Sequence, residues 1–484
     1  MRSSTLAFLL LPLLALSLAY YVQSHNSPLG PAPHLGVSLG VPLTLSGLAS
    51  LAQAAAARVR SAATLAAVHP DVIYNNAHHY LVNVPVPKIQ WPAVVQQWIP
   101  DLGLGSSVVI QQKPTTSSGL PALTLGPFEP LEVDPNREEF RRRIVAVGDI
   151  HGDVLNAYKI LQTAGVVNEE GNWTGEVDMF VQTGDIIDRG DDTIILFKWF
   201  EDLRVEAEAV GGRVISHMGN HEWMNVIGDW RYVLPTEIQT FETVQKRFEA
   251  LTTGWLGEAW AANYTVTSRI PLHPSLGPPN TDYPAPPASP HAHANNAGPL
   301  SHAAFSFVHG GLAPQYPALA PFPSAINELG ASLLRKLRFR RPLPRPHPPY
   351  GYPGLPAGTT PEEARLYGGD GPLWYRGWAE LPDAVVCKQV DGVLEKTGTR
   401  RMVMGHTPNF EGIRSRCDGK IIIIDTGISH AYGGAISALS VEYKLVPLQK
   451  GGWKEQEVVK AIYAEKEEEV LVMASRDVDG DDFW

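Results

Sequence analysis

Side chains that bind metals follow a series of short apolar runs in this sequence. Asp149 and His151 come directly after residues 144–147, and at a spacing of two they point the same way in extended chain. A carboxylate beside an imidazole suits Mn, Fe or Zn better than Ca. Later runs end in four more side chains that can bind a metal: Asp185, Asn220, His309 and His406. The set therefore predicts a metal site.

The number of ligands favours two metal ions. Two cations repel each other strongly unless carboxylates lie on or between them, and Asp185 is placed to bridge. Such a pair can hold a hydroxide and clamp a phosphoryl group. Nearby, Arg189 can fork onto phosphate oxygens, and His221 can donate a proton with Asp188 orienting its ring. The predicted chemistry is hydrolysis of a phosphate ester.

An α/β fold would bring these residues together. The apolar runs lack alternation, which is typical of strands buried on both faces. They cover residues 144–147, 179–181, 213–216, 305–308, 402–404 and 421–424. Helical stretches at residues 154–164 and 193–209 lie between some of them. In such folds, polar residues just past the strand ends gather at one edge of the sheet.

The order of the motifs resembles a known superfamily. Gly-Asp-Ile-His-Gly-Asp begins at Gly148, Gly-Asp-Ile-Ile-Asp-Arg-Gly at Gly184 and Gly-Asn-His-Glu at Gly219, and His-Gly-Gly and Gly-His-Thr follow. From residue 141 to 443 the chain resembles the calcineurin-like metallophosphoesterases of the phosphoprotein phosphatase superfamily. Residues 220–233 resemble the Shewanella-like phosphatase branch. The resemblance implies an α/β fold with a central β-sandwich flanked by helices.

The resemblance also implies a role for each matching residue. Asp149, His151 and Asp185 would hold one divalent metal (Mn, Fe or Zn), and Asp185, Asn220, His309 and His406 the second. Arg189 and Asn220 would contact the phosphate, with His221 as general acid paired to Asp188. In residues 371–376, Arg376 matches a second phosphate-binding arginine. Asp425 would support the site without binding metal.

The implied activity is that of a metal-dependent phosphoprotein phosphatase, in which a metal-bridging hydroxide attacks phosphoserine or phosphothreonine, with phosphotyrosine left open. Hydrolysis of polyphosphate or of dinucleoside polyphosphates is the enzymatic alternative. An inactive binding protein that keeps the fold is the alternative of another class. Regulatory subunits cannot be inferred from the sequence.

Some features depart from the family pattern. Residues 429–434 replace the toxin-binding Ser-Ala-Pro-Asn-Tyr loop of animal-type phosphatases. Pro-rich insertions near residues 271–299 and 335–358 are expected to be irregular loops. A basic run at residues 335–341 is either a solvated helix face or a contact for an acidic substrate or partner. His291 and His293 indicate a chance loop pair rather than a metal site.

The remaining regions indicate the domain organisation. Residues 1–24 are typical of a signal peptide or signal anchor, and residues 25–135 form an Ala/Pro/Gly-rich extension with a helix at 49–68 and a short element at 91–102. The catalytic domain is expected at residues 136–470, followed by an acidic tail at 471–484. A membrane contact is expected only if the leader stays uncleaved.

The leader and two glycosylation sequons, at Asn172 and Asn263, predict the secretory pathway: the lumen of the endoplasmic reticulum or Golgi, a vacuole, or the exterior. Cys387 and Cys417 either pair there or stay free. The net charge of −11 gives no general attraction for nucleic acid.

Overall fold

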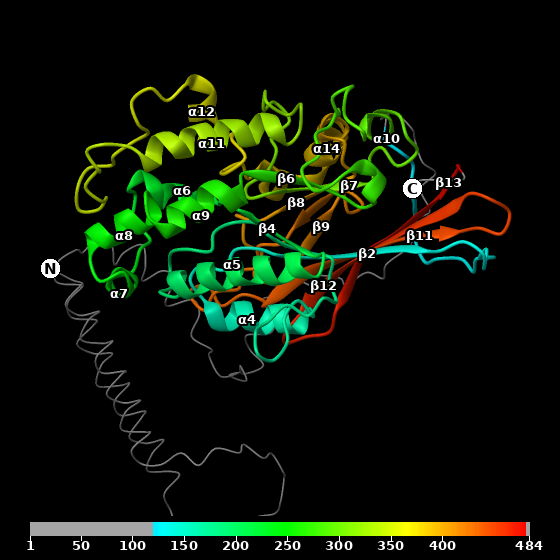
Figure 1. The fold of residues 1–484 in the computed structure, drawn as a ribbon, viewed down its shortest axis with the longest axis horizontal. Helices are drawn as coiled ribbons and strands as arrows, with labels where there is room; N and C mark the ends of the chain where they lie inside the picture. Colours follow the sequence, from blue (N-terminus) through cyan, green and yellow to red (C-terminus); the bar gives the residue numbers. More distant parts are fainter. Residues whose placement is uncertain (1–119, 481–484) are drawn as a thin grey trace, which may run out of the picture. The chain divides into compact units, whose positions relative to one another are not determined.

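The computed structural model describes residues 120–480, shown in colour in Figure 1. The predicted leader, the helix at 49–68, the element at 91–102 and the last four residues of the chain lie outside the described residues. Within the described part, no helix has the length and apolar character needed to cross a membrane.

The first sheet has eight strands and combines parallel with antiparallel pairing. Its sequence of neighbours is β1 (Thr124–Leu125), β13 (Glu469–Val478), β12 (Trp453–Tyr463), β11 (Ser437–Pro447), β2 (Phe140–Val147), β3 (Met179–Gln182), β4 (Arg213–His217) and β5 (Tyr264–Thr265). From β2 to β5 the neighbours are parallel, whereas β2 and the strands on its other side pair antiparallel. Strand β2 is therefore the junction between a parallel half and an antiparallel half.

The second sheet has five strands and the same mixture. Its neighbours are β6 (Thr267–Pro271), β7 (Ala304–Val308), β8 (Arg401–Met404), β10 (Ile421–Ile423) and β9 (Arg414–Arg416). The pairs β7–β8 and β8–β10 are parallel, and the two outer pairs are antiparallel. The carboxyl ends of β7, β8 and β10 consequently meet at one edge.

Alternating side chains build the layers around these sheets. On β2, Ile144 and Ala146 lie in one apolar cluster with Phe305 and Val403 of the second sheet, so this cluster fills the space between the sheets. The intervening Val145 and Val147 lie in the other cluster, together with helix side chains. Helices therefore flank a central sandwich, as the sequence predicted.

The helices divide into two groups in Figure 1. Helices α4 (Val154–Thr163) and α5 (Thr193–Ala209) contact strands of the first sheet, namely β11, β12 and β4. A second group gathers at the upper left of the view. It contains α6 (Asn220–Ile227), α7 (Pro235–Thr240), α8 (Val244–Leu251), α9 (Trp255–Asn263), α11 (Ser324–Arg338) and α12 (Pro361–Leu366). The others are η2 (Pro274–Leu276), α10 (Ala292–Asn296), α13 (Gly377–Glu380) and α14 (Asp383–Thr397).

Two predicted domain boundaries are wrong. Strand β13 continues to Val478 and pairs with β12, so the domain does not end at residue 470. At the other end, β1 pairs with β13 ahead of the expected start at residue 136. The reason is that strand pairing, not composition, defines membership of a sheet, and the acidic residues from Asp477 onward drew attention away from the apolar run of β13.

The Pro-rich insertions are partly ordered by short helices. The first contains η2 and α10, and the basic run at residues 335–341 begins as the last turn of α11. The two cysteines, left open by the sequence, form a disulfide that joins α14 to the turn after β9 (Cys387–Cys417).

Candidate metal centre

The predicted ligands lie at the carboxyl ends of five strands. Asp149 and His151 follow β2, Asp185 follows β3, Asn220 begins the helix after β4, and His309 and His406 follow β7 and β8. All six side chains are buried. Parallel strands place these ends at one edge of each sheet, and the sandwich brings the two edges together.

Backbone strain is concentrated in this region. Nine non-glycine residues among those described have positive φ, and five belong to the predicted site: His151, Asp185, Asp188, Arg189 and His406. This left-handed conformation is costly for side chains other than glycine, and it persists only where the surrounding structure enforces it. Strained backbone of this kind gathers at functional sites, so it indicates that these loops serve the site and not stability.

Two glycines allow the loops to approach each other. A Cβ atom at Gly219 would lie 2.2 Å from Asp185 Oδ1, and one at Gly405 would lie 2.4 Å from Asp149 Oδ1. Both distances are too short for non-bonded atoms, so no larger residue fits at either position without moving the carboxylate.

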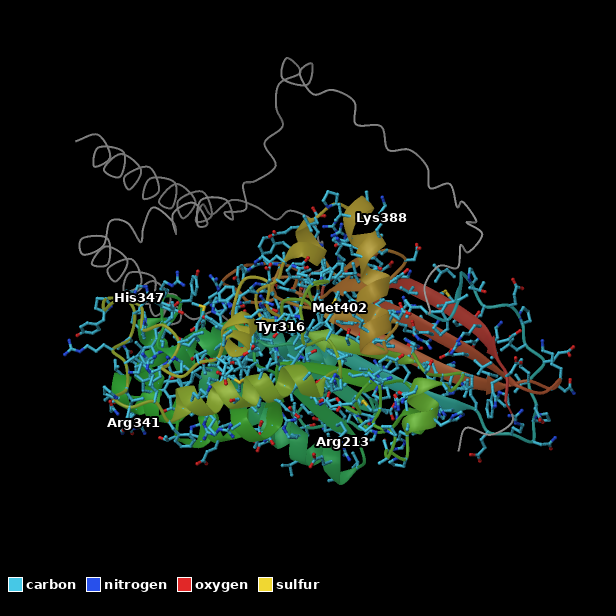
Figure 2. The ribbon with its side chains drawn as sticks, turned by 90° about the horizontal axis from the view of Figure 1, so that it is seen from above. Arg213, Tyr316, Arg341, His347, Lys388 and Met402 are labelled. Carbon is cyan, nitrogen blue, oxygen red and sulfur yellow. A yellow bond between two sulfur atoms is a disulfide. The ribbon has the colours of Figure 1, made fainter. Side chains whose placement is uncertain are left out.

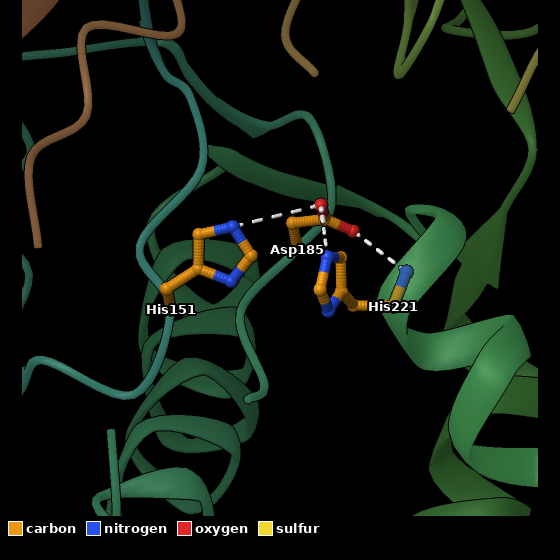
Figure 3. Close-up of side chains that lie close together, drawn as sticks. All are labelled: His151, Asp185 and His221. Carbon is orange, nitrogen blue, oxygen red and sulfur yellow. Dashed lines mark hydrogen bonds and ion pairs between the residues drawn. The ribbon is translucent and has the colours of Figure 1, made fainter. Parts of the chain in front are cut away.

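Asp185 lies at the centre of the cluster. Its Oδ2 is 3.7 Å from His151 Nε2, 3.8 Å from His221 Nε2 and 3.3 Å from His309 Nε2. Figure 3 shows the first two of these approaches and the backbone N–H of His221 donating to the other carboxylate oxygen. Asp185 therefore belongs to both groups able to hold an ion: His151, Asp185 and His221, and Asp185, His309 and His406.

The other predicted ligands surround the same carboxylate. His309 Nε2 is 2.8 Å from Asn220 Oδ1, and its Nδ1 lies 4.0 Å from Asp149 Oδ1. The backbone N–H of His406 donates to Asp149 at 3.1 Å. The structure thus brings all six predicted ligands into one cluster. His291 and His293 belong to neither metal-capable group in the described part of the chain.

The hydrogen bonds of the imidazoles leave ring nitrogens free for a metal. Nδ1 of His151 donates to the carbonyl of Ile187 at 3.0 Å, and Nδ1 of His309 donates to that of Thr183 at 3.0 Å. A carbonyl accepts only, so in the neutral His151 ring Nε2 keeps its lone pair. Nε2 of His309 lies 2.8 Å from Asn220 Oδ1, the oxygen predicted to share a metal ion with it. Nε2 of His406 is buried and has no hydrogen-bond partner among the described residues. These nitrogens are suited to metal ligation.

The charges of the cluster also fit cations. Burial, with the neighbouring Asp425 and Asp185, raises the pKa of Asp149 well above its usual value. Burial and Asp185 raise the pKa of Glu222 to about 7. Within the described residues no Lys or Arg forms an ion pair with Asp149, Asp185 or Asp425. Among those residues the carboxylates therefore have only histidines as possible positive partners, and divalent ions would supply further positive charge.

His221 is held by a buried chain of polar groups. Its Nδ1 donates to Asp188 Oδ2 at 2.6 Å, and Asn225 Nδ2 donates to the other oxygen of Asp188 at 2.9 Å. Arg247 then bridges Asn225 Oδ1 (2.7 Å) and Glu237 Oε1 (2.8 Å). Burial would lower the pKa of His221, but Asp185 and Asp188 outweigh it and raise the pKa. The ring is thus oriented, and its protonated form is favoured.

Both predicted phosphate-binding arginines line the same pocket, whose volume is about 280 Å³. The Arg189 guanidinium lies 4.3 Å from the ring centre of Tyr232 and 4.9 Å from that of Tyr432. Arg376 donates to the carbonyl of His406 at 2.7 Å, which fixes its position. The two arginines thus line one pocket together with residues of the metal-capable cluster.

The sequence interpretation missed several residues of the site. Glu222 accepts hydrogen bonds from the backbone N–H groups of Asp185, Ile186, Ile187 and Gly219, so it fixes the loop after β3. Three aromatic residues line the pocket: Tyr232, Trp374 and Tyr432. The signal for Glu222 was its place in the Gly-Asn-His-Glu motif. Tyr232 lay in the segment that resembled the Shewanella-like branch.

The sandwich, the shared carboxylate and the two arginines define the class: a metal-dependent phosphoesterase. The chain belongs to the calcineurin-like phosphoesterase family, whose model matches residues 142–430. The predicted fold class, superfamily and enzyme class are therefore confirmed.

Three relatives place the chain more closely. A protein of unassigned function from Schizosaccharomyces pombe is 35% identical over 303 residues, which cover 62% of this chain and 76% of the relative. Shewanella-like protein phosphatase 2 of Arabidopsis thaliana is 28% identical over 327 residues, covering 62% and 74%. Shewanella-like protein phosphatase 1 of Plasmodium berghei is 28% identical over 294 residues, covering 59% and 67%. The predicted resemblance to the Shewanella-like branch is confirmed.

Among solved structures, the cold-active protein-tyrosine phosphatase of a psychrophilic Shewanella species matches with a TM-score of 0.45 and 20% identity. The match covers 68% of this chain and 80% of the other.

Proposed function

We propose that the protein is a metal-dependent phosphoprotein phosphatase that hydrolyses phosphate monoesters. The observation that carries the proposal is the pair of metal-capable groups sharing Asp185 at the floor of a pocket lined by Arg189 and Arg376. Two of the relatives are named as protein phosphatases.

The metal ions would be held as the sequence predicted. Asp149, His151 and Asp185 are assigned to one, and Asp185, Asn220, His309 and His406 to the other. His221 also belongs to a metal-capable group, but Asp185 and Asp188 raise its pKa despite its burial, which favours the protonated ring over a metal ligand, and we assign it to proton donation. When bound, the ions supply Lewis acidity and a nucleophilic water at neutral pH. Mixed carboxylate and imidazole ligands suit Mn, Fe or Zn.

The protein groups have separate tasks around the phosphate. Arg189, held between two aromatic rings, and Arg376, fixed by the carbonyl of His406, bind the phosphoryl oxygens and stabilise the charge that develops there. His221 Nε2 faces the pocket and donates its proton to the departing oxygen. Asp188 keeps the donating tautomer in place by accepting from Nδ1.

The aromatic rim of the pocket favours phosphotyrosine among the phosphorylated residues. Tyr232, Trp374 and Tyr432 surround the charged floor. Their rings can contact a substrate ring by edge or offset stacking, which the short phosphoserine side chain cannot use. We expect Trp374→Ala to lower kcat/KM for a phosphotyrosine peptide and to change it little for the matching phosphoserine peptide.

The activity is tested by supplying Mn, Fe or Zn to the purified protein and comparing phosphopeptides, inorganic polyphosphate and diadenosine tetraphosphate. The proposal expects the highest kcat/KM on phosphopeptides. Preference for either anhydride would replace it with the alternative hydrolase. Failure to bind metal near two ions per chain, with no turnover, would instead favour an inactive binding protein.

We also propose that the protein works in the secretory pathway. The predicted leader supports this location, and so does the Cys387–Cys417 disulfide, because such bonds are rare in the cytosol. The two sequons differ in setting. Asn172 is exposed in a loop, whereas Asn263 is half-buried and donates to Glu201 at 2.5 Å. We therefore expect the glycan on Asn172.

The location is tested by expressing the full chain in eukaryotic cells and treating it with an N-glycosidase. A mobility shift that Asn172→Gln abolishes and Asn263→Gln keeps is expected. Protein in the cytosol, without any shift, would overturn the proposed location and leave the proposed activity untouched.

A further inference from the structure

The end of α11 and the second Pro-rich insertion form a strongly basic segment in an acidic protein. Residues 333–358 contain no Asp or Glu, while the chain as a whole carries a net charge of −11. The segment has six positive residues: Arg335, Lys336, Arg338, Arg340, Arg341 and Arg345. Lys336 pairs with Glu363 at 2.6 Å. Within residues 120–480, none of the five arginines has an ion pair with a carboxylate, although the charge of Glu258 acts on Arg338.

The insertion is fixed to the segment that leads into the pocket. The backbone N–H of His347 donates to the carbonyl of Gly228 at 2.9 Å, and that of Trp230 donates to the carbonyl of His347 at 2.6 Å. This ladder continues directly into Tyr232, whose ring lines the pocket beside Arg189. The insertion therefore lies next to the site on this side.

A second connection runs along aromatic side chains. Tyr352 of the insertion shares a side-chain hydrogen bond with Tyr367, and the ring of Tyr367 is 5.8 Å from that of Trp374. Trp374 lines the pocket. The insertion thus borders the pocket through both Tyr232 and Trp374.

Four side chains of the insertion are exposed enough to contact a partner. Arg341 and Arg345 are exposed, as are Tyr350 (46%) and Tyr352 (51%). Arg345 lies 4.9 Å from the ring centre of Tyr350. Arg340, in contrast, is used inside the loop, where it donates to the carbonyls of Pro353 and Gly354. We call Arg341, Arg345, Tyr350 and Tyr352 the insertion surface.

We propose that the insertion surface docks an acidic stretch of the phosphoprotein substrate, close in sequence to the phosphorylated residue. The inference rests on the proposed function, since it assumes a polypeptide substrate. The rest of this acidic protein repels such a stretch, so an uncompensated basic surface beside the pocket directs it there. Position at the pocket rim favours a substrate chain over a membrane, because a membrane contact needs no connection to the site.

The test reverses two charges on the insertion surface and two elsewhere. Arg341→Glu/Arg345→Glu is compared with Lys388→Glu/Lys396→Glu on α14, which makes the same change in net charge. Figure 2 shows Arg341 and His347 both at the left of the view, Arg341 below His347, and Lys388 well to the right of them. Substrates are p-nitrophenyl phosphate, a phosphopeptide flanked by glutamates, and the same peptide with glutamines.

Wild-type protein is expected to prefer the glutamate peptide, and the preference should weaken at high ionic strength. Arg341→Glu/Arg345→Glu should lower kcat/KM for that peptide by roughly fivefold or more, since two attractions become repulsions. Its kcat/KM for p-nitrophenyl phosphate and the kinetics of the α14 variant should stay unchanged. Equal rates on both peptides would overturn the proposal. If the charge reversal prevents folding, Arg341→Gln/Arg345→Gln replaces it.

Binding of an unphosphorylated glutamate-rich peptide separates the docking surface from the activity. Binding that depends on Arg341 and Arg345 supports docking even if no phosphopeptide is hydrolysed, which would refute the proposed function alone. Hydrolysis of phosphopeptides without such binding would refute docking alone. Binding to phosphatidylserine vesicles that needs these arginines, with no peptide preference, would replace the proposal with a membrane contact.

Discussion

The two ends of strand β8 carry buried charge clusters that are balanced in opposite ways. At its start, Arg400 and Arg401 pair with Glu455 and Glu457, and Arg476 joins them. Beyond its end, His406 lies among the carboxylates of Asp149, Asp185 and Asp425, which lack any Lys or Arg ion pair within the described residues. The first cluster supplies its own cations, and the second has room for cations from solution.

The pKa values follow the same contrast. Burial raises the pKa of Glu455, but Arg400 and Arg476 outweigh it and lower the pKa below its usual value. In the metal cluster the pKa of Asp425 rises to about 6, because burial and the charge of Asp185 outweigh a hydrogen bond from Gly427 and the charge of His309. Burial would also raise the pKa of Asp185, but His309 and His221 outweigh it and hold that pKa well below its usual value. The comparison teaches that the described part of this fold balances buried carboxylates with arginines where only stability is required, and surrounds them with histidines alone where metal ions are proposed to bind. Four experiments can break or sharpen that view.

Metal removal should have the largest effect. Stripping the protein with a chelator is expected to abolish phosphatase activity and lower the melting temperature, because the metal-cluster carboxylates then repel one another. The folded-state pKa values of Asp425 and Glu222 are raised, to about 6 and about 7. The metal-free protein should therefore gain stability as the pH falls from about 7 towards about 5, because these two carboxylates take up protons. Full activity in protein shown by elemental analysis to be metal-free would contradict the comparison.

Asp185→Asn comes next. The change keeps the shape of the side chain but removes the charge shared by both metal-capable groups. We expect kcat to fall by about a thousandfold or more, equivalent to about 4 kcal/mol. Steady-state kinetics and metal content measure the effect, and Asp178→Asn, away from the cluster, serves as the control. Near-normal turnover would refute the bridging role.

Glu455→Gln should act on stability and leave chemistry alone. Removing this charge takes from Arg476 its only paired carboxylate among the described residues and leaves Arg400 with the longer contact to Glu457 (3.5 Å), at a cost of about 3 kcal/mol in the free energy of unfolding. Because its folded pKa is lowered, the contribution of Glu455 is complete above its unfolded pKa and is lost as the pH falls through the folded value. Urea titrations should therefore find the two proteins converging in acid. A change in kcat of the folded variant would disprove the separation of the clusters.

Asn225→Ala should have the smallest effect of the four. Asn225 holds the oxygen of Asp188 that His221 does not use, so it is a positioning residue. We expect kcat to fall about tenfold with KM little changed. The limb of the pH–rate profile that reports His221 should shift, which a loss of stability alone would not cause. An unmoved pH profile would assign Asn225 a purely structural role.

The sequence predicted the parts of the fold that lie next to the motifs. Strands β3, β4, β7, β8 and β10 and helix α5 agree with the predicted runs to within one or two residues, because short apolar runs ending in Gly and Asp mark buried strands. Strand β13 was missed because the acidic residues at and beyond its end match the pattern of a solvated tail. Its place in the sheet depends on β12, and a strand read alone does not reveal its partner.

For the site, the sequence identified the functional side chains but not the residues that hold them in position. The six proposed ligands could be named because each belongs to a short ordered motif. Arg247 and Glu237 could not, since they are remote in sequence from His221 and reach it only through Asn225 and Asp188. The aromatic rim was hidden for the same reason: Tyr232, Trp374 and Tyr432 come from three separate loops.

The position of β11 has a consequence for how the protein is made. This strand lies between β12 and β2, and its Leu439 pairs with Ala146. The first sheet therefore stays divided until the ribosome has released nearly the whole catalytic domain, since pairings between distant segments must wait for both. His406 also emerges late. A nascent chain of this enzyme can hold no complete metal centre, so phosphatase activity is withheld until synthesis is almost finished.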